Sequence, residues 1–97
     1  MPTYIALLNW TEQGIANIRE TLEGAERAAE RAQAHGARLE RLYWTMGPYD
    51  LVGILEAPDD ETASAFTLEP GSRGGVRTTT LRAYNREEMS GILERLG

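Results

Sequence analysis

The sequence predicts an α+β domain in which two helices cover one face of a four-stranded antiparallel sheet. Short runs rich in aliphatic and aromatic residues are typical of strands, and they occur at 4–8, 39–46, 51–55 and 76–84. Apolar residues at helical spacing occur between the first and second runs and between the third and fourth. Gly47 and Pro48 separate the two middle runs and favour a reversal, so a β-hairpin lies at the centre of the chain. The order strand, helix, strand, strand, helix, strand is the split β-α-β arrangement of ferredoxin-like domains.

Length and charge limit the classes of function. The 97 residues suit one domain, which buries roughly 60–70% of its unfolded surface. Fifteen acidic residues against ten arginines give a net charge of −5, and the chain has no lysine. Non-specific affinity for phosphate backbones depends on basic side chains that displace counterions. We therefore expect neither nucleic acid nor an anionic membrane as a partner.

Several chemistries and locations are disfavoured by the residues themselves. The chain has no cysteine, hence no disulfide framework, thiolate nucleophile or cysteine-based zinc site. Met1–Trp10 lacks the basic and apolar regions of a signal peptide, and no apolar run approaches the roughly 20 residues that span a bilayer. His35 is the only histidine and sits at a helix end without a partner for catalysis. We expect a soluble cytoplasmic protein without a metal or cofactor.

The first third of the chain predicts one strand and two helical segments. Tyr4–Leu8 is apolar on both alternating faces, as in a strand covered on both sides. Thr11 can cap a short helix over Glu12–Ile18. The main helix, Glu20–His35, ends before Gly36, which suits the left-handed position after a helix. Its stripe of mostly small residues should lie close against the sheet; the stripe comprises Leu22, Ala25, Ala28, Ala29 and Ala32.

The two strands of the central hairpin follow. In the strand Leu39–Met46, alternation places Leu42, Trp44 and Met46 on one face and Leu39, Tyr43 and Thr45 on the other. In the strand Leu51–Leu55, Gly53 indicates a bulge or a close approach of another backbone or a ligand.

The second helix opens at Pro58–Glu61 with a capping aspartate, continues through Phe66, and should end at Pro70. The glycines of Gly71–Gly75 predict a flexible loop after it. The amides of this loop could hold an anion, but a phosphate loop requires a helix directly after it, and a strand follows here.

The last strand, Val76–Tyr84, leads into a helix that Asn85 and Glu88 cap as a box-like pair. This helix carries a regular apolar stripe of Met89, Ile92, Leu93 and Leu96, and must dock on its own sheet or on a neighbour. The sheet face away from the helices is also apolar in nearly every strand. A second copy packed sheet to sheet, as an isologous dimer, is the simplest cover for it.

Four segments, covering nearly the whole chain, resemble the GYD domain family; they are Thr11–Ile15, Tyr43–Asp50, Glu56–Asp60 and Val76–Tyr84. The family's Gly, Tyr and Asp are matched here by Gly47, Tyr49 and Asp50. The resemblance implies a small protein with a dimeric α/β-barrel fold and no established activity. The sequence departs from the family at 68–75, where members usually continue the helix with small apolar residues. A similar hairpin occurs in the effector-binding domains of leucine-responsive regulators, in which small ligands bind between subunits.

Three functions remain open. The first is a small-molecule-binding or sensing module, with a pocket between helices and sheet or between subunits that Tyr4 and Tyr84 would help to line. Its candidate ligand-binding residues are Asn9, Trp10, Trp44, Tyr49, Asp50 and Arg82. For the aromatics the alternative is plain packing, and for Tyr49 and Asp50 it is hairpin geometry, with the aspartate capping its own turn. The second is an assembly subunit without a ligand. The third is a cofactor-independent oxygenase-type enzyme with Asp50 as acid or base, although no nucleophile is paired with a base.

Overall fold

The computed structural model describes all 97 residues except the side chain of Ser72. The strands are β1 (Thr3–Trp10), β2 (Arg38–Trp44), β3 (Leu51–Glu56) and β4 (Val76–Ala83). The helices are α1 (Glu12–Ala16), a 3₁₀ turn (Ile18–Glu20), α2 (Thr21–Ala34), α3 (Asp60–Ser72) and α4 (Arg86–Glu94).

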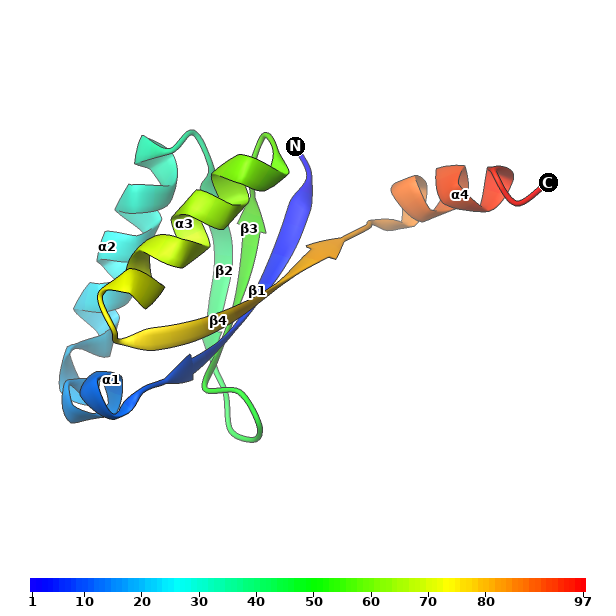
Figure 1. The fold of residues 1–97 in the computed structure, drawn as a ribbon. Coiled ribbons are helices and arrows are strands. Elements are labelled where there is room, and N and C mark those ends of the chain that lie inside the picture. Colours follow the sequence, from blue (N-terminus) through cyan, green and yellow to red (C-terminus); the bar gives the residue numbers. More distant parts are fainter.

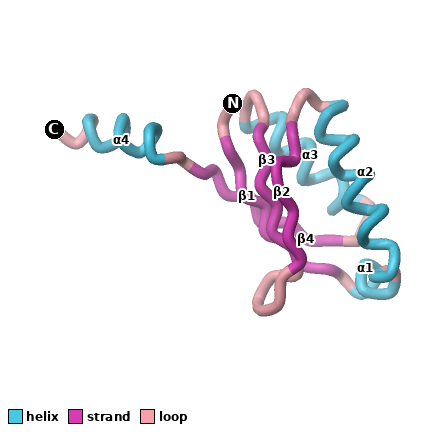
Figure 2. The backbone as a smooth tube through the Cα atoms, turned by 180° about the vertical axis from the view of Figure 1, so that it is seen from behind, coloured by secondary structure: helices cyan, strands magenta, loops and turns pink.

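The predicted fold class is confirmed. The four strands form one antiparallel sheet in the order β2-β3-β1-β4, and α2 and α3 lie side by side on one of its faces (Figures 1 and 2). This is the split β-α-β arrangement of ferredoxin-like domains, with α4 appended.

The strand register divides the side chains between two faces of the sheet. Tyr4, Leu55 and Leu39 are paired across β1, β3 and β2 on the face under the helices. The residues that alternate with these along each strand point to the other side of the sheet, which none of the described helices covers (Figure 2). This open face carries a row of apolar side chains, namely Ile5, Leu7, Tyr43, Val52, Ile54 and Leu81.

The packed core occupies only one end of the space between the helices and the sheet. It consists of Tyr4, Ala32, Ala37, Leu55, Ala57, Ala63 and Phe66. Ala32 from α2 and Leu55 from β3 are 0% and 1% exposed, so the two layers close completely there. Towards the start of α2 the layers separate around a cavity that Ala25 and Ala28 line, and Leu22, which lies outside that lining, is 65% exposed. The prediction that the whole stripe packs closely against the sheet was therefore wrong for its first half.

β2 differs from the predicted strand in two ways. A bulge between Leu39 and Arg41 shifts the register by one residue, so Leu39 lies on the same face as Leu42 rather than opposite it. The strand also ends at Trp44, and Met46 is 97% exposed in the hairpin loop. Strict alternation therefore placed Leu39 and Leu42 on opposite faces, which was wrong because of the bulge. The sequence had indicated a bulge at Gly53, in the neighbouring strand β3.

α3 continues past Pro70 to Ser72, so the prediction that Pro70 ends the helix was wrong. A proline removes one backbone donor, and in the last turn of a helix this costs a single hydrogen bond. The chain leaves the helical conformation at Gly74, which has a φ of 84°.

The glycine-rich loop after α3 holds the start of α1 in place. The carbonyl of Gly75 accepts a hydrogen bond from the Thr11 amide at 3.2 Å, and that of Gly74 accepts one from the Thr11 hydroxyl. The Arg73 carbonyl accepts a bond from the Gln13 side chain at 3.3 Å. The loop thus uses carbonyls, not amides, towards its neighbours, which does not suit an anion site there.

Candidate functional site

The hairpin loop and the end of β1 each contribute a side chain that binds a backbone group of the other. Asn9 Nδ2 donates to the carbonyl of Pro48 at 2.9 Å, and the amide of Trp10 donates to Asp50 Oδ2 at 2.9 Å. The Asp50 amide donates in turn to the carbonyl of Leu8 at 2.9 Å. Asp50 therefore ties the hairpin to the end of β1, and the expectation that its carboxylate caps its own turn was wrong.

The two predicted aromatic residues of the hairpin have different hydrogen-bond partners. Trp44 Nε1 donates to the hydroxyl of Thr21 at 2.8 Å, which fastens the edge strand β2 to the start of α2. Tyr49 is half-buried, and its carbonyl accepts a bond from the Thr45 hydroxyl at 2.5 Å.

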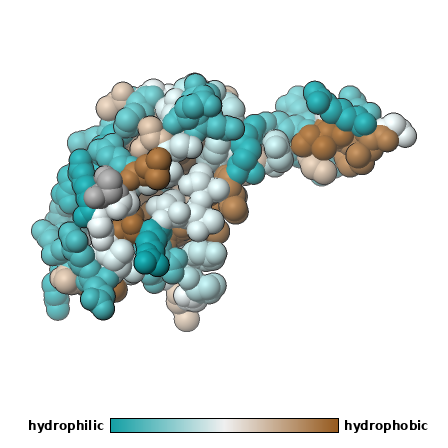
Figure 3. Space-filling model, viewed as in Figure 1, coloured by the Kyte–Doolittle hydropathy of each residue, from teal (hydrophilic) through white to brown (hydrophobic). Residues whose placement is uncertain are grey.

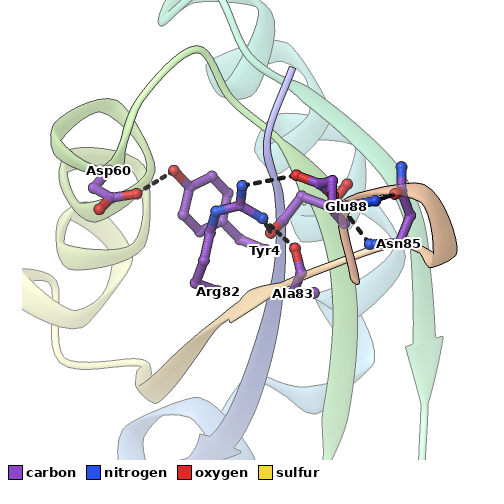
Figure 4. Close-up of polar contacts among 7 residues, drawn as sticks. Tyr4, Asp60, Arg82, Ala83, Asn85 and Glu88 are labelled. Atoms are coloured by element: carbon purple, nitrogen blue, oxygen red, sulfur yellow. Dashed lines mark hydrogen bonds and ion pairs between the residues drawn. The ribbon is translucent and has the colours of Figure 1, made fainter. Parts of the chain in front are cut away.

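Arg82 lies at the far end of the sheet from the hairpin. Its guanidinium stands 5.6 Å from the ring centre of Tyr4 and 4.7 Å from that of Tyr84. It also forms an ion pair with Glu88 Oε2 at 3.0 Å (Figure 4). The Asn85 amide and Arg82 together hold the pKa of the Glu88 carboxyl below its usual value. Arg82 thus fixes the start of α4 and does not share a pocket with Asp50.

Tyr4 beneath Arg82 is a buried hydrogen-bond donor. Its hydroxyl binds Asp60 Oδ1 at 2.5 Å, and the residue is 3% exposed (Figure 4). Burial, with help from the neighbouring Asp60, raises the pKa of this phenol to about 12. Tyr4 therefore remains protonated at neutral pH and serves as a structural link to α3.

A cavity of about 430 Å³ lies where α2 separates from the sheet, between α2, α3 and the inner sheet face. Of the six predicted site residues only Trp10 lines it, and of the predicted aromatic lining residues Tyr4, Trp44, Tyr49 and Tyr84 do not. The rest of this wall was not predicted because the small residues of the stripe, such as Ala25 and Ala28, indicated close packing against the sheet. Apolar side chains form most of the wall, among them Leu8, Leu39, Leu42, Leu51 and Phe66.

A few polar groups interrupt this apolar wall. The hydroxyl of Thr78 is buried and has no hydrogen-bond partner in the part of the chain that the structure describes. Arg31 lies over the ring of Phe66 at 5.7 Å and pairs with Glu69 at 3.7 Å. This composition is typical of small-molecule sites, which combine apolar walls with few placed polar groups.

Two apolar surfaces remain uncovered. Tyr43 and Leu81 on the open face are 52% and 44% exposed. The second surface is the α4 stripe, formed by Met89, Ile92, Leu93 and the following Leu96. α4 projects away from the sheet, and its apolar residues gather on one side of the helix (Figures 1 and 3). Patches of this kind mark sites of protein association.

The described residues offer no group of three His, Asp or Glu side chains that could hold a metal ion. None of the described helices has the length and apolar character that crossing a bilayer requires.

Comparison with known proteins places the chain in a family. The GYD domain profile matches residues 4–93. The chain belongs to the GYD domain family. The match covers the four strands except Thr3, the first residue of β1, and extends into α4.

A relative with a descriptive name comes from Thermus thermophilus. It is the "glutamine synthetase and cystathionine beta-lyase binding protein", 34% identical over 84 residues. The match covers 86% of this chain and 88% of that protein. The relative is thus named for binding two enzymes.

Solved structures share the fold of this GYD domain. MtbAldR superposes with a TM-score of 0.68 at 17% identity, covering 88% of this chain and 54% of that one. This chain therefore spans about half the length of MtbAldR. FFRP-DM1 gives 0.61 at 19% identity, covering 87% of this chain and all of that one. TTHA0845 from Thermus thermophilus gives 0.54 at 28% identity, covering 89% of this chain and all of that one.

Proposed function

We propose that this GYD protein is a homodimeric protein-binding module without catalytic activity of its own. The observation that carries the proposal is the pair of uncovered apolar surfaces, the open face and the α4 stripe. The open face is assigned to a second copy of the chain and the α4 stripe to a protein partner.

Self-association through the open face follows from its composition. Apolar side chains occupy the middle strands, β1 and β3, and charged groups such as Arg38 and Glu56 stand at the end of the face. An apolar centre with a polar rim is the usual anatomy of a stable interface. A twofold axis lets one such patch cover its own copy, which makes an isologous dimer.

The α4 stripe suits a partner that offers an apolar groove. The helix is held outward by its capping box, in which Asn85 and Glu88 bind each other's amides, and by the Arg82–Glu88 pair. An amphipathic helix fixed in this way binds as a helix in a groove. A dimer would present two copies of α4, and two linked contacts bind an oligomeric partner more tightly than one.

The partner class comes from the relative's name. We assign to this chain an enzyme partner of the kind that name gives, glutamine synthetase or cystathionine beta-lyase. The chain's own groups favour binding over chemistry, because Asp50 and Asn9 are engaged with backbone groups.

The partner assignment is tested with the two enzymes encoded in the same genome. Calorimetric titration with each enzyme should give saturable binding for the native chain and at least tenfold weaker binding for Leu93→Asp, which places a charge in the stripe. Gly91→Asp adds the same charge on the opposite side of α4 and should leave binding unchanged. Equal weakening by both variants, or no binding by the native chain, would contradict the assignment.

Small-molecule binding is a second candidate function, favoured by the cavity between α2, α3 and the sheet. It is compatible with protein binding, since a sensing module needs both sites. Native mass spectrometry of gently purified protein tests it, because a retained ligand adds a reproducible mass to the chain. A bare chain that also gains no thermal stability from a metabolite mixture would count against it.

A further inference from the structure

Small side chains leave room in the cavity for a ligand. Gly24, Ala25 and Ala28 face it from α2, and Ala6 faces it from the sheet. The volume of about 430 Å³ falls in the range of roughly 300–1,000 Å³ in which proteins hold small molecules. α2 and the sheet pack tightly around Ala32, at the other end of the helix. The stacking of a helix on the sheet therefore does not by itself leave a cavity.

The charges around the cavity differ in sign from the protein as a whole. Three arginines line it, Arg27, Arg31 and Arg73, against one acidic lining residue, Glu20; Glu69 stands outside the lining and pairs with two of the arginines. The complete chain carries a net charge of −5. A cationic lining within an acidic protein favours an anionic ligand, because the field is focused where low-dielectric walls surround the charges.

Two of these arginines share one carboxylate. Glu69 Oε1 lies 3.0 Å from Arg73 Nη2 and 3.7 Å from Arg31 Nε, and Glu69 Oε2 lies 3.3 Å from His35 Nε2. Arg31 also stacks on Phe66 at the cavity wall. A second carboxylate at this place would bind the arginines by charge-assisted hydrogen bonds, with the guanidinium held in position by the ring.

The sheet side of the cavity supplies a further polar atom. The Thr78 hydroxyl is buried without a hydrogen-bond partner among the described residues. A buried hydroxyl left in this state is costly, and a ligand oxygen can satisfy it.

We propose that this cavity binds a small carboxylate with an apolar body, the body lying against Leu8, Leu42 and Leu51 and the carboxylate on Arg31. The Thr78 hydroxyl binds a further polar atom of the ligand. The inference rests on the second candidate function and names its ligand class.

The test compares phenylbutanoate with phenylbutanol, which has the same apolar body and no charge. Trp10 lines the cavity and Trp44 does not, so a ligand in the cavity should change the tryptophan fluorescence of the native chain through Trp10. Phenylbutanoate should change this fluorescence saturably and bind at least tenfold more tightly than the alcohol. Arg31→Gln should weaken binding of the carboxylate about tenfold and leave binding of the alcohol unchanged, because it removes one charge-assisted contact.

Two further variants separate a binding role from a structural one. Glu69→Gln removes the competing carboxylate and should tighten binding of phenylbutanoate. Gly24→Leu fills the cavity and should abolish binding; its side chain starts from a position where only the end of Arg27 lies within 4 Å. Ala28→Leu serves if that variant fails to fold.

The outcomes distinguish the ligand class from the site. Equal binding of acid and alcohol, abolished by Gly24→Leu, would overturn the carboxylate assignment and keep the cavity as a binding site. Binding of neither probe, or binding that survives in both filled variants, would overturn the inference together with the second candidate function. None of these results bears on the proposed homodimer, which sedimentation tests separately.

Discussion

The carboxylate of Asp50 accepts a hydrogen bond from the backbone amide of Trp10 at 2.9 Å, across 40 positions of sequence. The Asp50 amide returns a bond to the carbonyl of Leu8. These two contacts anchor the hairpin to the end of β1. They also hold the backbone of Trp10, whose side chain forms part of the cavity wall.

Removing this carboxylate should lower stability. Asp50→Ala leaves the Trp10 amide without its partner, and we expect a loss of about 1–2 kcal/mol in the free energy of unfolding, measured by urea denaturation. Asp50→Asn keeps an oxygen acceptor and should lose less than half of that. If both variants kept full stability but lost ligand or partner binding, the structural role assigned to Asp50 would be wrong.

Two glycines in helices should respond to alanine in opposite ways. A Cβ at Gly14 would lie 2.1 Å from the carbonyl oxygen of Gly75, whereas one at Gly24 would meet only the end of Arg27 at 3.9 Å. Gly14→Ala should therefore cost about 1–3 kcal/mol by forcing two backbone segments apart. Gly24→Ala should add up to about 1 kcal/mol through helix propensity. Thermal unfolding of the pair measures both, and equal shifts would refute the close approach at Gly14.

The buried phenol of Tyr4 predicts a weakness at high pH. Its pKa is about 12 in the folded chain and 10.0 as a free group, so folding favours the protonated form. The stability it contributes is complete below about pH 10 and is lost as the pH rises through 12. The native chain should lose about 1.4 kcal/mol more than Tyr4→Phe between about pH 8 and pH 11. Parallel losses in urea titrations of the two proteins would contradict this.

The cap of α4 should control how well this helix is ordered. Asn85→Ala removes the side-chain oxygen that accepts a hydrogen bond from the Glu88 amide at 2.8 Å. The loss of a cap costs about 1 kcal/mol, so amide exchange in α4 should quicken about fivefold while exchange in β1 and β3 stays unchanged. Binding of the enzyme partner should weaken in the same variant. An unchanged exchange rate would show that α4 is ordered by other contacts.

Lowering the pH should loosen the same helix start. The pKa of the Glu88 carboxyl is held down by the Asn85 amide and by Arg82. The ionised Glu88 carboxylate stabilises the start of α4 fully above pH 4.5, the ordinary pKa of the group, and this stabilisation is lost as the pH falls below that value. The protection of the α4 amides, measured relative to their intrinsic exchange rate at each pH, should therefore fall in acid for the native chain, and Glu88→Gln should remove this dependence.

The fold was predictable because local signals agreed with one another. Gly47 and Pro48 marked the reversal, and the apolar run Leu51–Leu55 after it forms β3. Asn85 and Glu88 predicted the capping box that the structure contains. Two predictions failed. The bulge in β2 broke the strict alternation of side chains, and Pro70 did not end α3 because it lies in the last turn of the helix.

The candidate site was less predictable because polar residues in the sequence do not reveal their partners. Asn9 and Asp50 looked like site residues, and both bind backbone groups across 39 or 40 positions of sequence. The cavity exists because Gly24 and Ala28 have no large side chains to fill it. Small residues are equally common where a helix packs closely against a sheet. Which of the two occurs depends on the distance between α2 and the sheet, and that distance is set by the packed end around Ala32.

Sedimentation equilibrium of the native chain beside Leu81→Asp and Thr80→Asp tests whether the open face joins two copies of the chain. Leu81 points to the open face and Thr80, its neighbour in β4, to the opposite one. We expect a mass of twice 10.8 kDa for the native chain and for Thr80→Asp, and a monomer for Leu81→Asp. A native chain that sediments as a monomer, or a dimer that Leu81→Asp leaves intact, would contradict assembly through the open face.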